Sequence, residues 1–591
     1  MKQHHLACLI GLLSVCILPL LPVTLPSFAA SGTETTVRVS IDSNGGQGNS
    51  SSNGASISAD GRYTAFSSVA TNLVPNDTNG VADIFIHDQV TGQTIRGSVA
   101  SDGTQANGVS GDFGFALSAN GRYVAFRSQA NNLVPNDTNS TPDIFLFDIQ
   151  THQITRISVA SDGTQSNGFS SYPAISADGR YTAFSSTATN LIPGGTDGTE
   201  HIFIRDIQAN HTSLVSVSSN GTPGNLTSTI PAISADGRYV SFSSDATNLV
   251  SGDTNGQYDV FVYDRQTSQT TRVSVATNGA QGNGESAASS ISTDGRYVAF
   301  ESFASNLVAN DTNADVSDVF IHDRQSNQTI LVSLSTNGTQ GNNASDTPSI
   351  SNDGQYLAFR SDSTNLVAGD TNNSSDIFVR DLLTGETTRV SNSSNGTQAN
   401  GSADSPSISS DGRYIGFSST ASNLVLNDTN NFADVFQHDK GTPATSDQYI
   451  VFDSTRNGNR EIYAMNIDGS NVRRLTNTSS RNSNPTCSPN GQYVAFSSDR
   501  TGTFQGFVMN YDGANARALD NRTAEEIYPS WSPDSKAIAY AVKQTPTSTR
   551  QIEVLGLDGS TRTLASGTFP AWSPDGQQIA YESNSQIALM R

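Results

Sequence analysis

The chain has 591 residues, which is too long for one ordinary hydrophobic core, so at least two domains or a repeat array is expected. Only 15% of the residues are charged and 50 are glycine, a mixture that suits many short strands joined by polar turns. The formal net charge of −22 argues against nucleic acid and anionic membranes as partners, because both demand a positive surface.

The N-terminus has the features of an export signal. Lys2 precedes the apolar run LACLIGLLSVCILPLLPVTLP, and the small residues Ser27 and Ala29 offer a cleavage site, so we interpret residues 1–29 as a signal peptide. Three prolines interrupt the run and argue against a membrane anchor (Pro19, Pro22 and Pro26). No other stretch is long and apolar enough to span a bilayer. We therefore expect an exported protein, periplasmic or secreted, without an integral membrane segment after signal removal.

Residues 33–440 contain seven copies of one sequence unit. The motif SADGRYTAF at 58–66 returns six times in close variants, and the leucine of a following Asn-Leu pair recurs every 58 to 60 residues. Each copy has four short segments rich in β-branched and aromatic residues. In the third copy they are 172–176, 181–186, 201–206 and 212–218. Four antiparallel strands per repeat predict an all-β fold, with each copy forming one blade of a β-propeller.

The seventh copy lacks a fourth strand, and the N-terminus supplies a matching segment. DVFQHD (434–439) is followed by KGTPATSD, whereas TVRVSIDSNGGQGN (36–49) matches TRVSVATNGAQGN (271–283). Closing a ring removes sheet edges that would otherwise aggregate. We therefore predict that residues 33–440 form a seven-bladed propeller closed by its own N-terminal strand.

Residues 448–591 follow a linker at 441–447 and carry a shorter repeat of about 41 residues. It is seen in CSPNGQYVAFSS, WSPDSKAIAYAV and WSPDGQQIAYES, and in EIYAMNIDGS running into RRLT. These residues resemble the PD40 repeat of the TolB-type propellers; the seven longer copies resemble it more loosely. TolB-like propellers usually have six blades, and about four are counted here. We therefore expect a set that is small, open, or completed by docking on the first ring.

The long connections of each predicted blade leave from one face of the ring. They join strand two to strand three, and strand four to the next copy, whereas the other turns are tight. Long loops on a rigid scaffold are where binding usually occurs, so a protein or glycan partner is expected on this long-loop face.

Six copies place Asp, Asn and Asp in the connection from strand two to strand three. Carboxylates and amides alternating along a loop suit calcium, so these residues form a Ca²⁺ hypothesis. Asn and Asp are also standard turn formers, and we favour a turn-only role. The fifth copy is one residue longer and adds Asp315, while the third has Gly195, Asp197 and His201 instead. The candidate ligands are Asp77, Asn79, Asp83, Asp137, Asn139, Asp143, Asp253, Asn255, Asp259, Asp311, Asn313, Asp318, Asp370, Asn372, Asp376, Asp428, Asn430 and Asp434.

Two other recurring positions are interpreted structurally. The asparagine of each Asn-Leu pair, Asn72 in the first copy, is expected to clamp its loop. Three histidines share one position that holds Phe, Arg or Tyr in the other copies, so we expect exposed strand ends rather than ligands (His87, His322 and His438).

The sequence contains no recognisable catalytic signature. There is no Gly-x-Ser-x-Gly elbow, His-Glu-x-x-His motif, phosphate loop or dinucleotide fingerprint, and no catalytic carboxylate pair can be assigned. TolB-like propellers act as interaction scaffolds in the cell envelope, and the resemblance implies a non-enzymatic protein of that class. The alternatives are a calcium-stabilised adhesion or carbohydrate-binding module, and a glycan-active hydrolase or lyase with acids from several blades around the channel.

Overall fold

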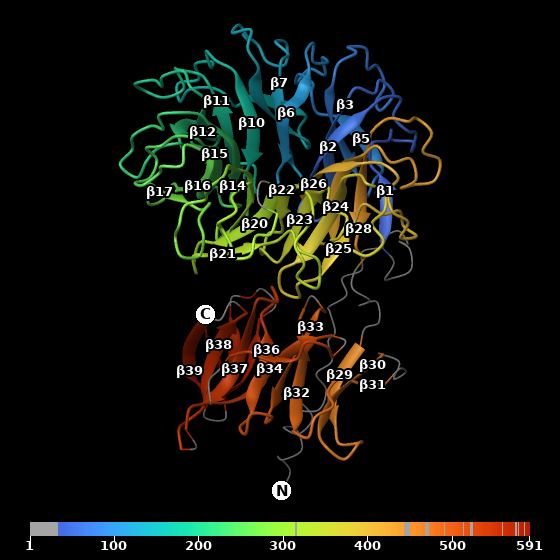
Figure 1. Cartoon of the computed structure of the whole chain (residues 1–591), viewed down its shortest axis with the longest axis vertical. Coiled ribbons are helices and arrows are strands. Elements are labelled where there is room, and N and C mark those ends of the chain that lie inside the picture. Colours follow the sequence, from blue (N-terminus) through green and yellow to red (C-terminus); the bar gives the residue numbers. More distant parts are fainter. Residues whose placement is uncertain are drawn as a thin grey trace. The chain divides into compact units, whose positions relative to one another are not determined.

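A computed structural model of the chain describes residues 34–313, 316–441, 449–466, 472–489, 491–511, 513–520, 524–545, 547–557, 560–573, 576, 578–583 and 586–590. All regular structure in these ranges is β-strand, and none of it is a helix that could cross a membrane (Figure 1). The strands fall into two compact units, Thr33–Lys440 and one that includes Gly441–Arg591. The predicted signal peptide, most of the predicted linker, and Asp315 lie outside the described residues.

The described part of the first unit contains seven four-stranded antiparallel sheets, one for each sequence copy. We number them sheet 1 to sheet 7 in chain order. Their strands, from first to last, are β2 (Ser52–Ile57), β3 (Tyr63–Ser68), β4 (Asp83–Asp88), β5 (Gln93–Arg96); β6 (Ser110–Leu117), β7 (Tyr123–Ser128), β8 (Asp143–Asp148), β9 (Gln153–Arg156); β10 (Ser170–Ile175), β11 (Tyr181–Ser186), β12 (His201–Asp206), β13 (His211–Leu214); β14 (Ser228–Ile233), β15 (Tyr239–Ser244), β16 (Asp259–Asp264), β17 (Gln269–Arg272); β18 (Ser286–Ile291), β19 (Tyr297–Ser302), β20 (Asp318–Asp323), β21 (Gln328–Leu331); β22 (Ser345–Ile350), β23 (Tyr356–Ser361), β24 (Asp376–Asp381), β25 (Thr387–Arg389); and β26 (Ala403–Ile408), β27 (Tyr414–Ser419), β28 (Asp434–Asp439), β1 (Thr35–Arg38).

The N-terminal strand β1 belongs to sheet 7. It pairs antiparallel with β28, with Thr35 opposite Asp439 and Arg38 opposite Phe436. Strand β2 of sheet 1 in turn contacts β26 and β27 of sheet 7. The N-terminal segment therefore supplies the fourth strand that the seventh copy lacks, and the first and last sheets are neighbours.

The first strand of each sheet is the innermost. First strands contact the first strands of the neighbouring sheets, and in Figure 1 they lie toward the middle of the unit, while fourth strands such as β17 and β21 lie at its rim. The fourth strands are shorter than the sequence predicts. In the third copy the strand ends at Leu214, after which the Val215 amide donates to the Ile202 carbonyl at 2.8 Å and the chain turns away.

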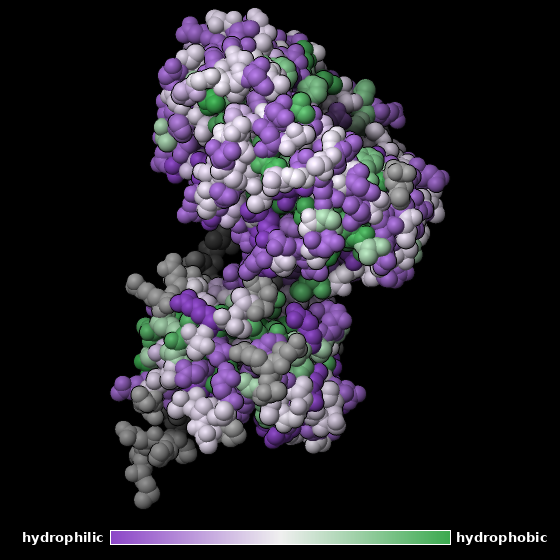
Figure 2. Space-filling model, turned by 60° about the vertical axis from the view of Figure 1, so that its left-hand side comes forward, coloured by the Kyte–Doolittle hydropathy of each residue, from purple (hydrophilic) through white to green (hydrophobic). Residues whose placement is uncertain are grey.

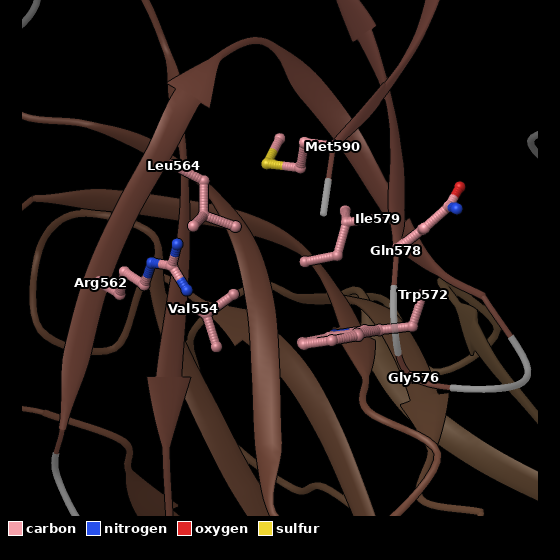
Figure 3. Close-up of a pocket in the computed structure, with 8 residues that line it drawn as sticks. All are labelled: Val554, Arg562, Leu564, Trp572, Gly576, Gln578, Ile579 and Met590. Atoms are coloured by element: carbon pink, nitrogen blue, oxygen red, sulfur yellow. The ribbon is translucent and has the colours of Figure 1, made fainter.

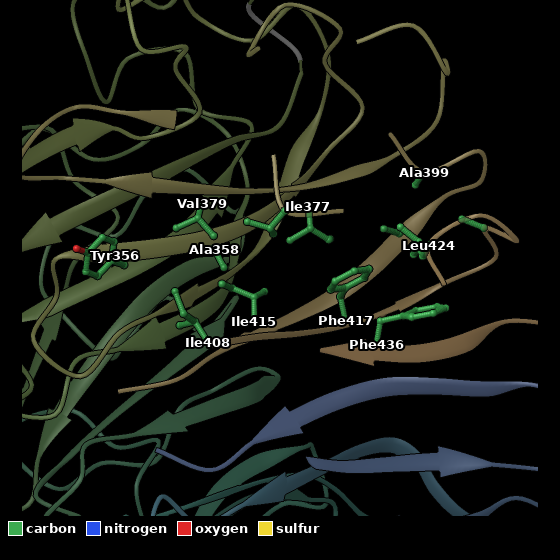
Figure 4. Packing of buried hydrophobic residues seen from close by; sticks show 13 residues of the cluster. Tyr356, Ala358, Ile377, Val379, Ala399, Ile408, Ile415, Phe417, Leu424 and Phe436 are labelled. Carbon is green, nitrogen blue, oxygen red and sulfur yellow. The ribbon is translucent and has the colours of Figure 1, made fainter. Parts of the chain in front are cut away.

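Apolar side chains from both faces of each sheet pack against the neighbouring sheets. Figure 4 shows the layer between sheets 6 and 7, where Ile377 and Val379 meet Ile415 and Phe417. Phe417 stacks on Phe436 with ring centroids 5.9 Å apart, and each of the other six sheets has an equivalent pair. Burying one such phenylalanine stabilises the fold by roughly 1.5–3 kcal/mol. The runs that are apolar on both sides of the strand thus form the interior between sheets.

A tyrosine–glycine contact joins every sheet to the next. The glycine of the Asp-Gly turn has a positive φ and lies against the tyrosine that begins the second strand of the preceding sheet. A Cβ added at Gly237 would lie only 2.2 Å from Tyr181. The seven pairs are Gly121 with Tyr63, Gly179 with Tyr123, Gly237 with Tyr181, Gly295 with Tyr239, Gly354 with Tyr297, Gly412 with Tyr356, and Gly61 with Tyr414.

The expectation that the shared histidine position is an exposed strand end is wrong. His87 and its two equivalents are at most 3% exposed. His87 Nδ1 lies 2.9 Å from Thr94 Oγ1, which donates at 2.5 Å to the carbonyl of Ile41. The position is buried because the segment that follows β1 in sheet 7 covers it, and the same cover recurs at the other sheets.

The second unit contains four smaller sheets among its described residues. Their strands are β29 (Tyr449–Ser454), β30 (Glu461–Asn466), β31 (Arg473–Arg474); β32 (Asn482–Cys487), β33 (Tyr493–Ser498), β34 (Gln505–Asn510), β35 (Arg517–Ala518); β36 (Glu525–Trp531), β37 (Ala537–Lys543), β38 (Gln551–Gly556), β39 (Thr561–Ser566); and β40 (Thr568–Trp572), β41 (Ile579–Ser583), β42 (Gln586–Met590). The first and last of these sheets have three strands each. This agrees with about four short repeats, the first and last incomplete.

Gly237→Ala tests the contact between neighbouring sheets. We expect it to lower the free energy of unfolding by about 2 kcal/mol more than Gly221→Ala does, because the added methyl group displaces Tyr181. Gly221 is a matched control, since it also has a positive φ, +85° against +72°, but nothing within 4 Å of an added Cβ. Denaturant unfolding of both variants measures the difference, and equal losses would show that backbone strain alone matters.

Candidate binding site at the inner strands

The Asp, Asn and Asp of the proposed calcium loops form one hydrogen-bonded network with the fourth strand and the loop after it. In sheet 1, Asp83 is fully buried, and its carboxylate accepts hydrogen bonds from Ser98 Oγ at 2.5 Å and Asn79 Nδ2 at 2.9 Å. Gln105 Nε2 donates to Asp77 Oδ1 at 2.7 Å. The structure therefore brings together the three residues of the motif and two partners that the sequence analysis did not identify.

An arginine from the fourth strand lies against both aspartates in five sheets. In sheet 1, Arg96 Nη1 is 3.2 Å from Asp77 Oδ1 and 3.6 Å from Asp83 Oδ2. A buried carboxylate needs a nearby positive charge or hydrogen bonds to remain ionised, and the guanidinium group supplies that charge. The equivalent sets are Arg156 with Asp137 and Asp143, Arg272 with Asp253 and Asp259, Arg389 with Asp370 and Asp376, and Arg38 with Asp428 and Asp434.

Sheet 3 loses the acids and the arginine together. Leu214 occupies the arginine position opposite Phe203, and His201 replaces the buried aspartate. His201 Nδ1 lies 3.2 Å from Ser216 Oγ, so the imidazole takes over the contact that Asp83 makes with Ser98. Asp197, at the position of the motif's asparagine, lies 3.1 Å from His201 Nε2, so sheet 3 replaces the arginine–aspartate contact by a histidine–aspartate contact.

Sheet 5 keeps the acids but lacks the arginine. Leu331 lies opposite Phe320, while Asp318 is 1% exposed and accepts hydrogen bonds from Ser333 Oγ at 2.6 Å and Gln340 Nε2 at 2.7 Å. Burial, opposed by these hydrogen bonds, raises the pKa of Asp318 to about 6. Sheet 5 therefore contains a buried carboxyl group without a neighbouring guanidinium.

The asparagine of each Asn-Leu pair clamps its loop, as predicted. Asn72 Oδ1 accepts a hydrogen bond from the Asn49 amide at 2.9 Å, and Asn72 Nδ2 donates to the Gln47 carbonyl at 2.8 Å. The connection between strands two and three is thus tied to the segment leading into the first strand. The long-loop face is held in shape by these bonds.

The most informative positions are those where the seven copies differ although the backbone is the same. The residue after the phenylalanine of the second strand is serine in four copies, arginine in two and glutamate in one (Ser67, Ser185, Ser243, Ser418, Arg127, Arg360 and Glu301). These side chains lie beside the first strands. The fold accepts serine, arginine and glutamate at this position, so binding can set the residue type there. An alignment of the seven copies would have revealed the position from the sequence.

The backbone next to these side chains is strained. The first strand of each sheet has an irregular register and, except in sheet 1 where Gly54 takes the place, a non-glycine residue with positive φ. Phe113 has φ +52° and Tyr172 +50°. The others are Ile230, Ala288, Thr347 and Ser405. The first strands of the second unit have the same feature at Asn484, Tyr528 and Phe569, so it is a bulge that belongs to the repeat, and it sets how the inner-strand side chains project.

In sheet 2 the inner strands present an aromatic and charged cluster. Arg127 is 8% exposed and pairs with Asp112 at 2.5 Å. Its guanidinium lies 5.0 Å from the ring centre of Phe113, which is 60% exposed. Phe113 meets Tyr172 of sheet 3 edge to face, with ring centroids 6.1 Å apart. An exposed phenylalanine held by an arginine and a tyrosine is typical of a binding surface rather than a core.

In sheet 6 a second arginine borders a polar hollow. Arg360 pairs with Asp346 at 2.6 Å and Asp362 at 3.1 Å, and donates to Ser375 Oγ at 2.7 Å. Arg360, Asp362 and Ser375 line the hollow, which has a volume of about 370 Å³.

Sheets 3, 4 and 5 contribute carboxylates to the same surface. Burial raises the pKa of Glu200, Asp245 and Glu301, and the nearby charges of Asp346 and Glu285 raise that of Glu301 further. We call the residues described here the inner ring: Asp112, Phe113, Arg127, Tyr172, Glu200, Asp245, Tyr258, Glu285, Glu301, Asp346, Arg360 and Asp362. The sequence analysis placed binding on this face of the unit but on its loops, and it named none of these residues.

The second unit has a hollow of different character. It measures about 210 Å³ and is lined mainly by apolar side chains, among them Leu564, Trp572 and Ile579 (Figure 3). These residues come from the last two sheets of the unit, so the hollow belongs to the packing between sheets. On the face seen in Figure 2, hydrophobic residues are scattered among hydrophilic ones, which is ordinary for a protein surface.

Comparison with known proteins identifies the C-terminal repeats. Residues 397–588 match the family model described as the TolB beta propeller domain, PD40. The match begins within the seventh long copy and extends through the short repeats, so this part of the chain has TolB-like PD40 repeats. The Tol-Pal system protein TolB of Geobacter sulfurreducens is 60% identical over 42 residues, and that of Desulfosudis oleivorans is 42% identical over 59 residues. These segments are 7% and 10% of this chain and span only 10% and 14% of the two relatives.

The likeness to solved structures is distant. Oligogalacturonate lyase from Vibrio parahaemolyticus is 12% identical, with 70% of this chain and 98% of that chain covered, and a TM-score of 0.41. A superposition of this quality carries no argument about function. The TolB-like assignment therefore rests on the C-terminal repeats, and the first unit is interpreted from its own residues.

Leu331→Arg in sheet 5 supplies the missing guanidinium beside Asp318. The folded-state pKa of Asp318, about 6, lies above the usual value, so the stability that it contributes is full at low pH and is lost as the pH rises through about 6. The arginine should lower this pKa and stabilise the variant by about 2 kcal/mol more at about pH 7.5 than at about pH 4.5.

Denaturant unfolding at the two pH values measures this effect. Leu331→Gln is the matched control, because its side chain is polar but uncharged at both pH values, so no pH-dependent gain is expected. A gain of the same size in both variants, or one independent of pH, would contradict the assignment of Asp318.

Proposed function

We propose that the protein is an exported, non-enzymatic propeller scaffold that binds a protein or glycan partner at the inner ring of its first unit. One observation carries the proposal: the residue after the phenylalanine of the second strand, beside the inner strands, is serine, arginine or glutamate in otherwise similar copies, and in sheet 2 it contacts the exposed ring of Phe113. The third-strand position of His87 also varies, but a neighbouring segment covers it, whereas a partner can reach an exposed ring at the inner strands.

Export and the TolB-like repeats support the same class of function. The apolar N-terminal run with Lys2 before it favours export. The C-terminal repeats resemble proteins named for the Tol-Pal system, which is a multi-protein system by its name. The acidic net charge of −22 disfavours nucleic acid and anionic membranes as partners.

Phe113→Gly separates binding from folding. The substitution removes an exposed ring and relieves a positive φ, so we expect an unchanged or raised melting temperature together with at least tenfold weaker partner binding. Binding is measured with envelope proteins cross-linked to the purified protein and, separately, on a glycan array. Leu426→Ala is the control on the long loops, where Leu426 is 93% exposed. If Leu426→Ala lost the partner and Phe113→Gly did not, the binding site would lie on the long loops instead.

The same glycans test the enzyme alternative. The carboxyl groups of Glu301 and Asp346 both have raised pKa values, as a general acid requires. Cleavage of a glycan that is lost in Glu301→Gln would establish a hydrolase or lyase in place of the scaffold.

The calcium alternative is tested by unfolding residues 31–591 after chelation, with and without added calcium or magnesium. We expect no calcium-specific rise in melting temperature, because Arg96 and Arg156 already place a positive charge beside the aspartates. A calcium-specific rise that is lost in an Asp77→Ala, Asp137→Ala double variant would establish calcium loops instead.

A further inference from the structure

We propose that the part of the inner ring formed by sheets 3 to 5 is a binding site for an organic cation, either a lysine or arginine side chain of a partner polypeptide or a free polyamine. This inference rests on the proposed function and specifies the ligand chemistry of the same surface. The site consists of four carboxylates, two tyrosines and a buried serine hydroxyl (Glu200, Asp245, Glu285, Glu301, Tyr172, Tyr258 and Ser243).

The four carboxylates differ from the other acids of the inner ring. Asp112 is paired with Arg127, and Asp346 with Arg360. Among the described residues, no basic side chain forms an ion pair with the four carboxylates of sheets 3 to 5. Arg127 and Arg360 are thus each paired with acids of their own sheets, Arg360 with two of them, whereas the carboxylates of sheets 3 to 5 have no ion pair in the part of the chain that the structure describes.

The hydrogen bonds of the carboxylates leave most of their oxygens available. Glu200 accepts one from Ser185 Oγ at 2.5 Å, and Glu301 accepts one from the Thr347 amide at 3.1 Å. A carboxylate can accept about four hydrogen bonds. These contacts hold the side chains in position and leave acceptor capacity for a ligand.

A buried polar group without a partner provides independent evidence for a ligand. Ser243 is 1% exposed, and its hydroxyl has no hydrogen-bond partner. Ser243 occupies the strand position of Ser185 and Glu301, whose side chains make the two contacts just described, so its hydroxyl points to the same side of the sheet. Asp245, two residues further along, also has a buried oxygen, Oδ1, without a hydrogen bond. At the same position Ser67, Ser185 and Ser418 donate to a first-strand carbonyl, a bond that Ser243 lacks, so its hydroxyl and Asp245 Oδ1 are both available to a ligand.

The aromatic rings define the type of cation. Tyr258 is close enough to Asp245, Glu200 and Glu285 for their charges to raise its pKa, in addition to the effect of burial. Tyr172 lies close to Glu200 in the same way. Tyrosine faces attract alkylammonium and guanidinium groups, and the methylene chain that carries such a group can lie against the ring. Carboxylates, a hydroxyl and tyrosines together suit an organic cation with several N–H donors.

The test is calorimetric titration of the mature protein with N-acetylated tetralysine amide and, separately, with spermidine, at about 0.15 M salt. We expect saturable binding of at least one of them and none of tetraglutamate. The double variant Glu200→Gln, Glu301→Gln should weaken binding at least tenfold, and Ser243→Ala should weaken it several-fold. Glu386→Gln is the matched control, since Glu386 is exposed on the turn between β24 and β25; it should bind within twofold of the unchanged protein.

Each result decides between named outcomes. Binding of tetralysine but not spermidine identifies a polypeptide as the source of the cation, and the reverse identifies a free polyamine. Absence of saturable binding for both, or equal weakening in Glu386→Gln, overturns the cation site. If neither cation binds while Phe113→Gly still loses the partner, the proposed scaffold is supported and the cation site is refuted.

Discussion

The contact of a tyrosine with the glycine of the next sheet is the constraint on which the first unit depends. Each sheet is too small to bury its apolar residues alone, so its stability comes from the two neighbours that cover it. The turn requires a positive φ at the glycine, and the absence of a Cβ lets the tyrosine ring approach. Because Gly61 meets Tyr414, the same contact also joins the last sheet to the first.

A second recurring element is electrostatic. The connection between the second and third strands ends in a buried aspartate, which the arginine of the fourth strand and the hydroxyl of a nearby serine keep in place. Burying a charge is costly unless it is paired and hydrogen-bonded. Sheet 3 replaces both aspartates and the arginine, whereas sheet 5 lacks only the arginine. Burial raises the pKa of this aspartate in all six sheets that have it, to about 6 for Asp318 in sheet 5.

The tyrosine–glycine contact and the arginine–aspartate network both lie away from the inner ring, so the residues of the inner ring can differ among the copies. The tyrosine–glycine contacts lie at the tight turns and the arginine–aspartate pairs at the fourth strands, whereas the inner ends of the first and second strands are linked by a serine pair such as Ser52 with Ser68. Phe113 and Tyr172 occupy the bulge of the first strand, which every sheet of the unit has. We explain the side chains that differ beside this bulge by a ligand, and the carboxylates of sheets 3 to 5, which have no ion pair among the described residues, indicate that the ligand is a cation.

The sequence by itself determined the β class, the four strands of each copy, the glycine turns, the asparagine clamps and the TolB-like character of the C-terminal repeats. These follow from local preferences and from repetition, which a single chain displays directly. Only the tertiary structure decided that His87 is buried, that Arg96 lies against Asp77 and Asp83, and that Phe113 meets Tyr172. The physical reason is distance along the chain. Charged groups and rings from different strands and sheets become neighbours only once the strand register and the packing of the sheets are set. No local sequence pattern contains that information.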